Sequence, residues 1–320
     1  SPGAASGGHC SRRGIGTRDD PAADAQTVNP VQPLPTDDAG KPLFELPDEL
    51  AIDTDVARGV ITGFIRGQLE QAGFERCVLA LSGGIDSALS CVLAVEALGA
   101  GNVLVVRMPY KTSSPESLAD ADLLVNKFNL HNNLVVEITS MVDPLFEHVP
   151  DADSKRRGNA MARARMIVLY DQSSAFNGLV IGTGNKTEIL LGYTTIFGDA
   201  ASALNPLGDL YKTQVRQLAA AVGVPRPIID KPPTADLWLG QTDEGELGFT
   251  YERVDQLLYL LVDQRYRRDE AIAAGFEPAF VDKVIATIRR NQFKRMPPLI
   301  AKLSNRTVGY DFLYLRDWGS

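Results

Sequence analysis

The sequence is poor in cysteine: Cys10, Cys77 and Cys91 are the only three, and no two of them form a C-x-x-C pair. This argues against a disulfide framework or a cysteine-rich metal site, and it favours a reducing compartment such as the cytoplasm. Long apolar runs are also missing, because no stretch approaches the roughly 20 residues that a bilayer span needs. We therefore expect a cytoplasmic protein with no membrane partner.

Positive charge is scarce as well. The 32 Lys and Arg residues are outnumbered by 40 Asp and Glu residues, which gives a formal net charge of −8 at pH 7. A surface of that sign does not attract nucleic acid by bulk electrostatics, and only a local basic patch would do so. We therefore expect no nucleic-acid partner. At 320 residues, 44% of them hydrophobic, the chain can form one large domain or one domain with an extension.

Two common nucleotide-binding motifs are absent, G-x-x-x-x-G-K-[ST] and G-x-G-x-x-G. Instead, an apolar strand at residues 78–81 runs into a Ser-Gly-Gly turn and then a helix to about Leu98. Glycines lack Cβ, so the backbone can bring several N–H groups to one anion, and the helix start adds unpaired donors. The pattern predicts a phosphate-binding loop that includes Ser82, Gly83, Gly84, Asp86 and Ser87, and the nucleotide site is expected to include Ala80, Leu81 and Ile85 as well.

Asp86 stands out in this loop, because a carboxylate repels phosphate unless a cation lies between them. Its presence therefore indicates Mg²⁺. The alternative is an ordinary strand-to-helix turn in which Asp86 merely starts the helix. A second glycine turn follows a strand at residues 179–181 and leads, through Thr183, to Glu188.

Strands and helices alternate through the middle of the chain. Apolar strands at residues 102–108, 134–138 and 179–181, separated by helices, predict an α/β fold with a doubly wound parallel sheet and helices on both faces. Both glycine turns should then lie at the carboxyl edge of the sheet, where Asp86 and Glu188 can meet at one Mg²⁺.

The ends of the chain differ in composition from this middle part. Residues 1–45 are rich in Gly, Ala, Pro, Ser and Asp, which predicts a disordered leader before a single domain at residues 46–320. An amphipathic helix should come first and end at Gly73, with Val56, Val60, Phe64 and Leu69 as its apolar positions. A long ordered loop is expected at residues 231–248, followed by a C-terminal helical segment.

The Ser82–Ser87 loop resembles the S-G-G-x-D-S loop of the ATP pyrophosphatase superfamily, whose members cleave ATP to AMP and pyrophosphate while adenylating a second substrate. Taken in order, eight motifs resemble those of the NAD synthetase family: S-G-G-I-D-S, R-A-R-M, G-T-G-N-K-T-E, Y-T-T-I-F-G-D, L-Y-K-T-Q-V, K-P-P-T-A-D-L-W, Q-T-D-E-x-E-L-G and F-K-R-M-P-P. The resemblance covers about residues 50–300. It implies an adenine nucleotide alpha hydrolase-like fold, a homodimer with the dinucleotide near the subunit interface, and ATP-dependent amidation of deamido-NAD to NAD with Mg²⁺.

The resemblance also assigns residues. It implies that residues 80–87 bind the ATP phosphates, that Asp86 and Glu188 bind Mg²⁺, and that further ATP contacts come from Thr183, Lys212 and Thr234. The implied deamido-NAD contacts are Arg163, Phe293 and Lys294. Asp199 falls where the family has an acidic residue near the ammonia site, so Asp86, Asp199 and Lys212 are the implied catalytic residues. Taken singly, Lys212 could also be a surface lysine, Asp199 a turn former and Thr234 a cap.

The chemistry agrees with these roles. Adenylation converts a poor acylating carboxylate into a mixed anhydride with AMP as leaving group. The charge that develops on pyrophosphate calls for Mg²⁺, Lys212 and backbone N–H groups. Because ammonium is not nucleophilic, a carboxylate near the pocket could hold it and accept its proton, and Asp199 is the candidate for this role.

Two positions depart from the ammonia-dependent pattern. Ile196 replaces a lysine and Ala203 an aspartate, both of which contact the dinucleotide in many members. The Y-T-T-I-F-G-D form looks closer to the glutamine-dependent enzymes, but about 45 leading residues cannot hold their glutaminase domain. We therefore expect free ammonia, or ammonia from a separate partner. The alternatives are amidation of nicotinic acid mononucleotide and a non-catalytic nucleotide-binding regulator.

Overall fold

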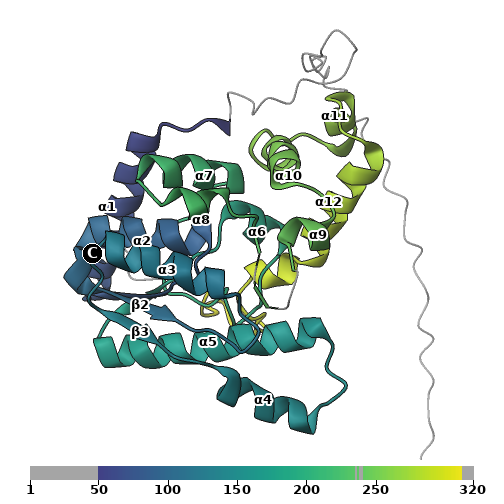
Figure 1. Ribbon diagram of the computed structural model, residues 1–320. Coiled ribbons are helices and arrows are strands. Elements are labelled where there is room, and N and C mark those ends of the chain that lie inside the picture. Colours follow the sequence, from purple (N-terminus) through teal and green to yellow (C-terminus); the bar gives the residue numbers. More distant parts are fainter. Residues whose placement is uncertain (1–49, 235, 238–240, 312–320) are drawn as a thin grey trace, which may run out of the picture. The chain divides into compact units, whose positions relative to one another are not determined.

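A four-stranded parallel sheet lies at the centre of the computed structural model, which describes residues 50–234, 236, 237 and 241–311. The leader expected at residues 1–45 lies outside the described residues. The strands are β1 (Cys77–Ala80), β2 (Val103–Arg107), β3 (Asn133–Val135) and β4 (Leu179–Ile181). They are hydrogen-bonded in the order β3-β2-β1-β4, and every pair is parallel, as predicted (Figure 1).

Helices cover both faces of the sheet. Cys77, Leu79 and Val105 pack into a core shared with one group of helices, whereas Val78 and Val106 pack into a core on the opposite face. The two-residue period of a strand separates the two sets. The first group is α1 (Thr54–Ala72), α2 (Ile85–Leu98), α3 (Pro115–Lys127), α7 (Lys212–Ala221) and α8 (Arg226–Asp230); the second is α4 (Thr139–His148) and α5 (Ser154–Phe176). The predicted doubly wound α/β fold is confirmed (Figure 1).

The order of the strands explains where the site lies. β2 pairs with one edge of β1 and β4 with the other, so the loops that leave β1 and β4 begin side by side at the carboxyl edge of the sheet. Open α/β sheets bind ligands at this switch point. Both glycine turns of the sequence start here.

The expected C-terminal helical segment is present and has its own core. Tyr211 and Tyr251 are its largest fully buried side chains, and Leu50 and Val254 are buried beside them. Its elements are α6 (Lys186–Leu191), α9 (Asp243–Leu247), α10 (Tyr251–Leu258), the π-helix η3 (Tyr259–Asp263), α11 (Arg268–Ala273), α12 (Pro278–Arg290) and the 3₁₀-helix η4 (Gln292–Arg295). A further 3₁₀-helix, η2 (Ala100–Asn102), joins α2 to β2.

Three elements differ from the sequence-based expectation. The helix α4 was not predicted, and β3 is shorter than the strand expected at residues 134–138. The stretch 231–248 is not a loop throughout, because it contains α9. Thr242 caps this helix by accepting the Gly245 N–H, and acidic residues in its first turn suit the positive end of the helix dipole.

The helix α1 has the predicted end but a different buried face. Asp53 caps its start, and Gly73, at φ +77°, ends it in a left-handed conformation. Ile61, Ile65 and Leu69 face the core. Of the four apolar positions expected to define its buried side, only Leu69 is buried, and Val56, Val60 and Phe64 are exposed.

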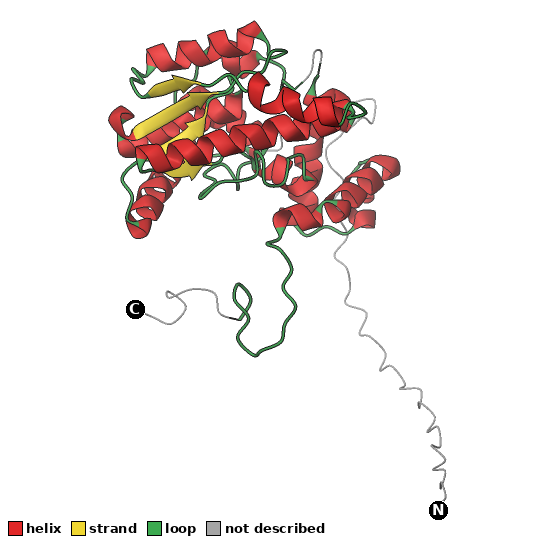
Figure 2. Cartoon of the chain, turned by 90° about the horizontal axis from the view of Figure 1, so that it is seen from below, coloured by secondary structure: helices red, strands yellow, loops and turns green. Residues whose placement is uncertain are grey.

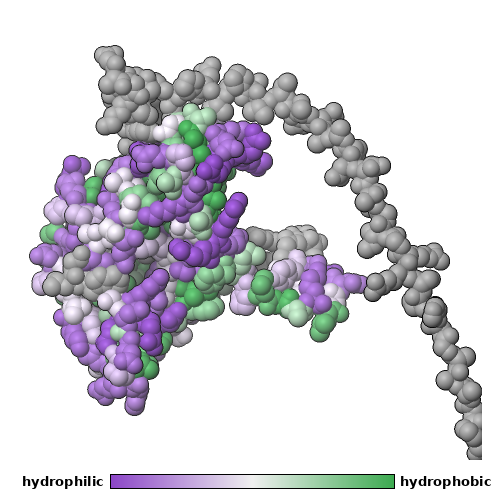
Figure 3. Space-filling view, turned by 90° about the vertical axis from the view of Figure 1, so that its right-hand side faces the viewer, coloured by the Kyte–Doolittle hydropathy of each residue, from purple (hydrophilic) through white to green (hydrophobic). Residues whose placement is uncertain are grey.

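After η4 the chain continues as a loop, residues 296–311, that projects from the helices (Figures 2 and 3). Its leucines at 299 and 303 are 84% and 96% exposed. Among the helices that the structure describes, none combines the length and the apolar character needed to cross a membrane.

Candidate active site

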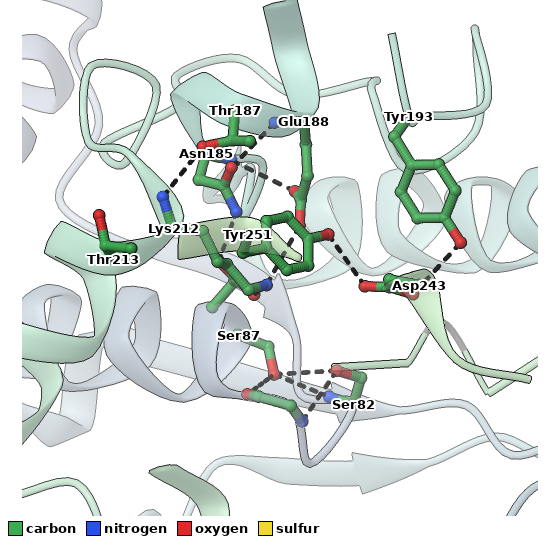
Figure 4. A network of polar contacts seen from close by, with 12 residues as sticks. Ser82, Ser87, Asn185, Thr187, Glu188, Tyr193, Lys212, Thr213, Asp243 and Tyr251 are labelled. Atoms are coloured by element: carbon green, nitrogen blue, oxygen red, sulfur yellow. Dashed lines mark hydrogen bonds and ion pairs between the residues drawn. The ribbon is translucent and has the colours of Figure 1, made fainter. Parts of the chain in front are cut away.

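The loop between β1 and α2 is built around Gly83. This residue has φ +82°, and a Cβ added to it would lie 2.2 Å from the Ser117 carbonyl oxygen, so only glycine fits. The Ser82 N–H donates to Ser87 Oγ at 3.2 Å, and Ser87 Oγ donates to the Gly84 carbonyl at 2.9 Å (Figure 4). The residue before α2 is Gly84, so no side chain caps the first turn of the helix. The N–H groups of that first turn lie at the positive end of α2 and suit a phosphate.

Beside this loop, the Lys212 ammonium lies between two carboxylates. Lys212 Nζ is 2.5 Å from Asp86 Oδ2 and 3.2 Å from Glu188 Oε1. The three side chains come from α7, α2 and α6, and they are only 3%, 16% and 16% exposed. Asn185 Nδ2 donates to Asp86 Oδ1 at 2.8 Å, and the Glu188 N–H donates to Asn185 Oδ1. The two carboxylates that were predicted to meet at the sheet edge are therefore brought together.

Burial and charge act in opposite directions here. Burial raises the pKa of Glu188, and the neighbouring Asp86 and Asp243 add to the shift, while Lys212 opposes it. Burial lowers the pKa of Lys212, but Asp86 and Glu188 outweigh it, so the pKa of the lysine lies above its usual value. Lys212 therefore remains a cation at neutral pH, which its predicted contact with phosphate requires.

Three residues behind Lys212 were given no role by the sequence analysis: Tyr193, Asp243 and Tyr251. Asp243, in α9, accepts hydrogen bonds from Tyr193 Oη at 3.2 Å and Tyr251 Oη at 3.1 Å (Figure 4). The Tyr251 ring centroid is 5.1 Å from Lys212 Nζ, a cation–π distance. Burial raises the pKa of Asp243. The Q-T-D-E-x-E-L-G motif contains this aspartate, but its spacing does not reveal which side chains it faces.

A cavity opens on the β4 side of the site. It has a volume of about 140 Å³, and its lining includes Gly182, Asp199, Asn205 and Lys294. Asp199 Oδ1 accepts the Thr195 N–H at 2.8 Å, and Lys294 Nζ donates to the carbonyls of Gly192 and Thr194. Two residues that were predicted for ammonia and for deamido-NAD thus line one cavity. The bond to Thr195 also gives Asp199 the turn-forming role that was its alternative.

The remaining predicted residues are more dispersed. Thr183 is half-buried just after β4, and Phe293 is 59% exposed. Arg163, on α5, donates to the Ile196 carbonyl at 3.3 Å. Thr234 Oγ1 donates to the Gln241 carbonyl at 2.8 Å and accepts the Asp236 N–H, so these contacts tie its own loop together.

The fold and the site are those of an open α/β protein, a class that binds ligands at the carboxyl edge of its parallel sheet. The model of the NAD synthase family matches residues 58–298, and the chain belongs to that family.

Individual proteins agree with the family match. An NH3-dependent NAD(+) synthetase of Trichlorobacter lovleyi is 56% identical over 270 residues, which are 84% of this chain and 98% of the relative. Among solved structures, NMN synthetase of Francisella tularensis has a TM-score of 0.70 at 30% identity and covers 79% of this chain and 100% of its own. NH3-dependent NAD synthetase of Campylobacter jejuni has a TM-score of 0.68 at 33% identity, with the same coverage.

Proposed function

We propose that this chain amidates deamido-NAD to NAD, using ATP and ammonia, through an acyl-adenylate intermediate and with release of AMP and pyrophosphate. One observation carries the proposal. A buried lysine and two carboxylates meet beside a glycine loop at the switch point of the sheet, in a chain 56% identical to an NH3-dependent NAD(+) synthetase.

The glycine loop and Lys212 would act on the ATP phosphates. The first-turn N–H groups of α2, with Ser82 and Ser87, would hold the phosphate chain. Lys212, which carries a positive charge in a buried position, would stabilise the charge that builds up on the leaving pyrophosphate. Thr183 and Thr234 would complete the ATP site.

Asp86 and Glu188 fit Mg²⁺. In the part of the chain that the structure describes, no group of three or more His, Cys, Asp or Glu residues is arranged to hold a metal. A site with two carboxylates, completed by phosphate oxygens and water, is the usual arrangement for Mg²⁺ in a nucleotide site. Bound there, the ion would neutralise charge on the phosphates as the α-phosphorus is attacked.

The cavity of Asp199 and Lys294 would serve the second half-reaction. Asp199 would hold the entering ammonium and accept its proton, which leaves ammonia to attack the acyl carbon. The Thr195 N–H fixes this carboxylate in the cavity.

The dinucleotide would lie against Arg163, Phe293 and Lys294, near a subunit interface. Arg163 shares one face of α5 with Ile167 and Tyr170, since these positions are four and three residues apart. Ile167 is 56% and Tyr170 is 40% exposed. An exposed apolar face beside the substrate arginine supports a homodimer in which both subunits approach the substrate.

A second substrate, nicotinic acid mononucleotide, is a candidate because NMN synthetase of Francisella tularensis is similar in structure. The higher identity of the NH3-dependent NAD(+) synthetases, 56% against 30%, favours deamido-NAD.

A coupled assay tests the proposal directly. Purified protein, ATP and Mg²⁺ are incubated with deamido-NAD and either ammonium chloride or glutamine, and NAD is read with alcohol dehydrogenase. We expect NAD with ammonium and none with glutamine. A parallel reaction replaces deamido-NAD by nicotinic acid mononucleotide. Amidation of the mononucleotide alone would support the second substrate, and no amidation in any arm would contradict both.

A further inference from the structure

Behind the site, a buried hydrogen bond joins two residues to which no role has been assigned. Thr187 Oγ1, on α6, lies 2.5 Å from Asp255 Oδ1, on α10, and both side chains are fully buried. Thr187 belongs to the G-T-G-N-K-T-E motif. It is the neighbour of Glu188 in sequence, and its hydroxyl faces Asp255 on α10.

The same two residues satisfy the start of a third helix. The Lys212 N–H donates to Thr187 Oγ1 at 3.0 Å, and the Thr213 N–H donates to Asp255 Oδ2 at 2.8 Å. Lys212 and Thr213 are the first two residues of α7, whose N–H groups have no partner within the helix. The Thr187 hydroxyl therefore donates to α10 and accepts from α7 at the same time.

This junction sets the distance between two residues of the site. Lys212 is fixed through its own N–H, and Glu188 is the residue after Thr187, so both backbones are tied to one hydroxyl and one carboxylate. The π-helix η3, which directly follows α10, adds a second tie, because Lys186 Nζ is 2.8 Å from Asp263 Oδ1. Consecutive residues of α6 are thus held by two aspartates that lie eight positions apart.

Asp255 is an expensive way to cap a helix in a protein core. It is 0% exposed, and the described residues include no salt-bridge partner for it. An isolated buried carboxylate costs free energy unless hydrogen bonds satisfy it, whereas an apolar residue would not carry that cost. Its two hydrogen-bonding partners, Thr187 and Thr213, are by contrast the sequence neighbours of Glu188 and Lys212 in the proposed ATP and Mg²⁺ site.

We propose that Thr187 and Asp255 are positioning residues that keep Lys212 and Glu188 at the separation needed for Mg²⁺ and nucleotide to bind. The inference rests on the proposed roles of Lys212 and Glu188. Neither Thr187 nor Asp255 contacts the substrate itself.

Thr187→Val and Thr187→Ser separate positioning from simple stability. Valine matches the shape of threonine but neither donates nor accepts, whereas serine keeps the hydroxyl. We expect Thr187→Val to weaken Mn²⁺ binding in the presence of α,β-methylene-ATP at least tenfold, measured by electron paramagnetic resonance, and to raise the KM for ATP by a similar factor. Thr187→Ser should stay within threefold of wild type in both measurements.

A matched control and a second variant keep the test decisive. Asp53→Ala removes the cap of α1, far along the chain from the site, and should lower the melting temperature without changing nucleotide affinity. Asp255→Asn keeps an acceptor for the Thr213 N–H, but its amide N–H replaces the oxygen to which the Thr187 hydroxyl donates. This variant therefore tests the pair if Thr187→Val does not fold. A Thr187→Val or Asp255→Asn protein that loses only melting temperature, as Asp53→Ala does, would overturn the inference.

The binding measurement needs neither deamido-NAD nor ammonia. If wild type binds Mn²⁺ and the nucleotide but makes no NAD, the proposed function fails, and the comparison of Thr187→Val with Thr187→Ser still decides the positioning role. If NAD is made normally and Thr187→Val binds like wild type, the function stands and the positioning role falls.

Discussion

Lys212 Nζ lies 2.5 Å from Asp86 Oδ2, although the two residues are 126 positions apart in the sequence. The same nitrogen is 3.2 Å from Glu188 Oε1. The lysine ammonium therefore lies between the two carboxylates that are proposed to bind Mg²⁺. Without the ion the two carboxylates share its single positive charge, and with the metal bound the ammonium would share them with the ion or move toward the phosphates.

Lys212→Met should show this relationship. Removing the ammonium leaves two poorly exposed carboxylates without compensation, which costs about 3 kcal/mol of unfolding free energy. Magnesium chloride should restore part of that stability in Lys212→Met and should change wild type much less, since the ion replaces the lost charge. Urea unfolding with EDTA and with Mg²⁺ measures both effects.

Lys111→Met is the matched control. Lys111 pairs with Asp143 at the surface, where its side chain is 54% exposed, so its loss should change stability little and should not alter the response to Mg²⁺. An equal response to Mg²⁺ in Lys212→Met and wild type would show that lysine and metal do not share the carboxylates.

Asp86→Asn should abolish the ATP half-reaction. The amide keeps the size of the side chain but loses the negative charge that binds Mg²⁺, so pyrophosphate release from ATP and deamido-NAD should fall at least a hundredfold. Asp230→Asn, which removes a carboxylate 60% exposed on α8, should leave the rate unchanged. Full activity of Asp86→Asn would contradict its assignment as a metal ligand.

The meeting of Asp86 and Glu188 could be predicted because strand order decides it. Each carboxylate follows a glycine turn at the carboxyl end of a parallel strand, and β1 and β4 are neighbours in the sheet. A local pattern is enough when the topology brings its ends together. The hydrophobic pattern of α1 was less informative, because Val56, Val60 and Phe64 repeat with the helical period and yet are exposed.

Asp243 and Asp255 could not be predicted in the same way. Both belong to helices of the C-terminal segment, and their partners are set by how those helices pack: α10 on α6 and α7 for Asp255, and α9 on α10 for Asp243. An acidic residue inside an amphipathic helix normally faces water, so its sequence position gives no sign of burial. The buried pairing of Lys212 was hidden for the same reason, since a lysine at a helix start is usually a surface residue.

Asp199→Asn should separate the two half-reactions. Asparagine Oδ1 can still accept the Thr195 N–H, so the loop should fold, but the amide cannot take a proton from ammonium. We expect kcat/KM for ammonium to fall at least a hundredfold while the KM for ATP stays within threefold. Initial rates over a range of ammonium chloride concentrations measure this. A variant that loses affinity for ATP instead would place Asp199 in the first half-reaction.

Ile167→Asp tests the proposed homodimer. If the exposed face of α5 forms the interface, a charge at its centre should convert a dimer into a monomer, as measured by light scattering after gel filtration. Leu123→Asp is the matched control, since Leu123 is 45% exposed on α3, away from Arg163. A wild-type monomer, or a dimer that survives Ile167→Asp, would remove α5 as the interface.

Asp255 should leave a signature in the pH dependence of stability. Burial raises its pKa to about 6, against hydrogen bonds from Thr187 and Thr213 that lower it, whereas an aspartate in the unfolded chain has a pKa of about 4. Between these two values the folded protein holds a proton that the unfolded chain has released. The contribution of this proton to the unfolding free energy is therefore complete below about pH 4 and is lost as the pH rises through 6.

Asp255→Asn removes that titration. The unfolding free energy of wild type minus that of Asp255→Asn should fall by about 2–3 kcal/mol between pH 4 and pH 7, measured by urea unfolding at unit steps of pH. Other buried acids, such as Asp243, titrate in both proteins, so their effect cancels in the difference. If the difference between the two unfolding free energies stays constant from pH 4 to pH 7, Asp255 is ionised throughout this range. Its hydrogen bonds to α6 and α7 would then outweigh the cost of burial, which would make the junction stronger than the raised pKa indicates.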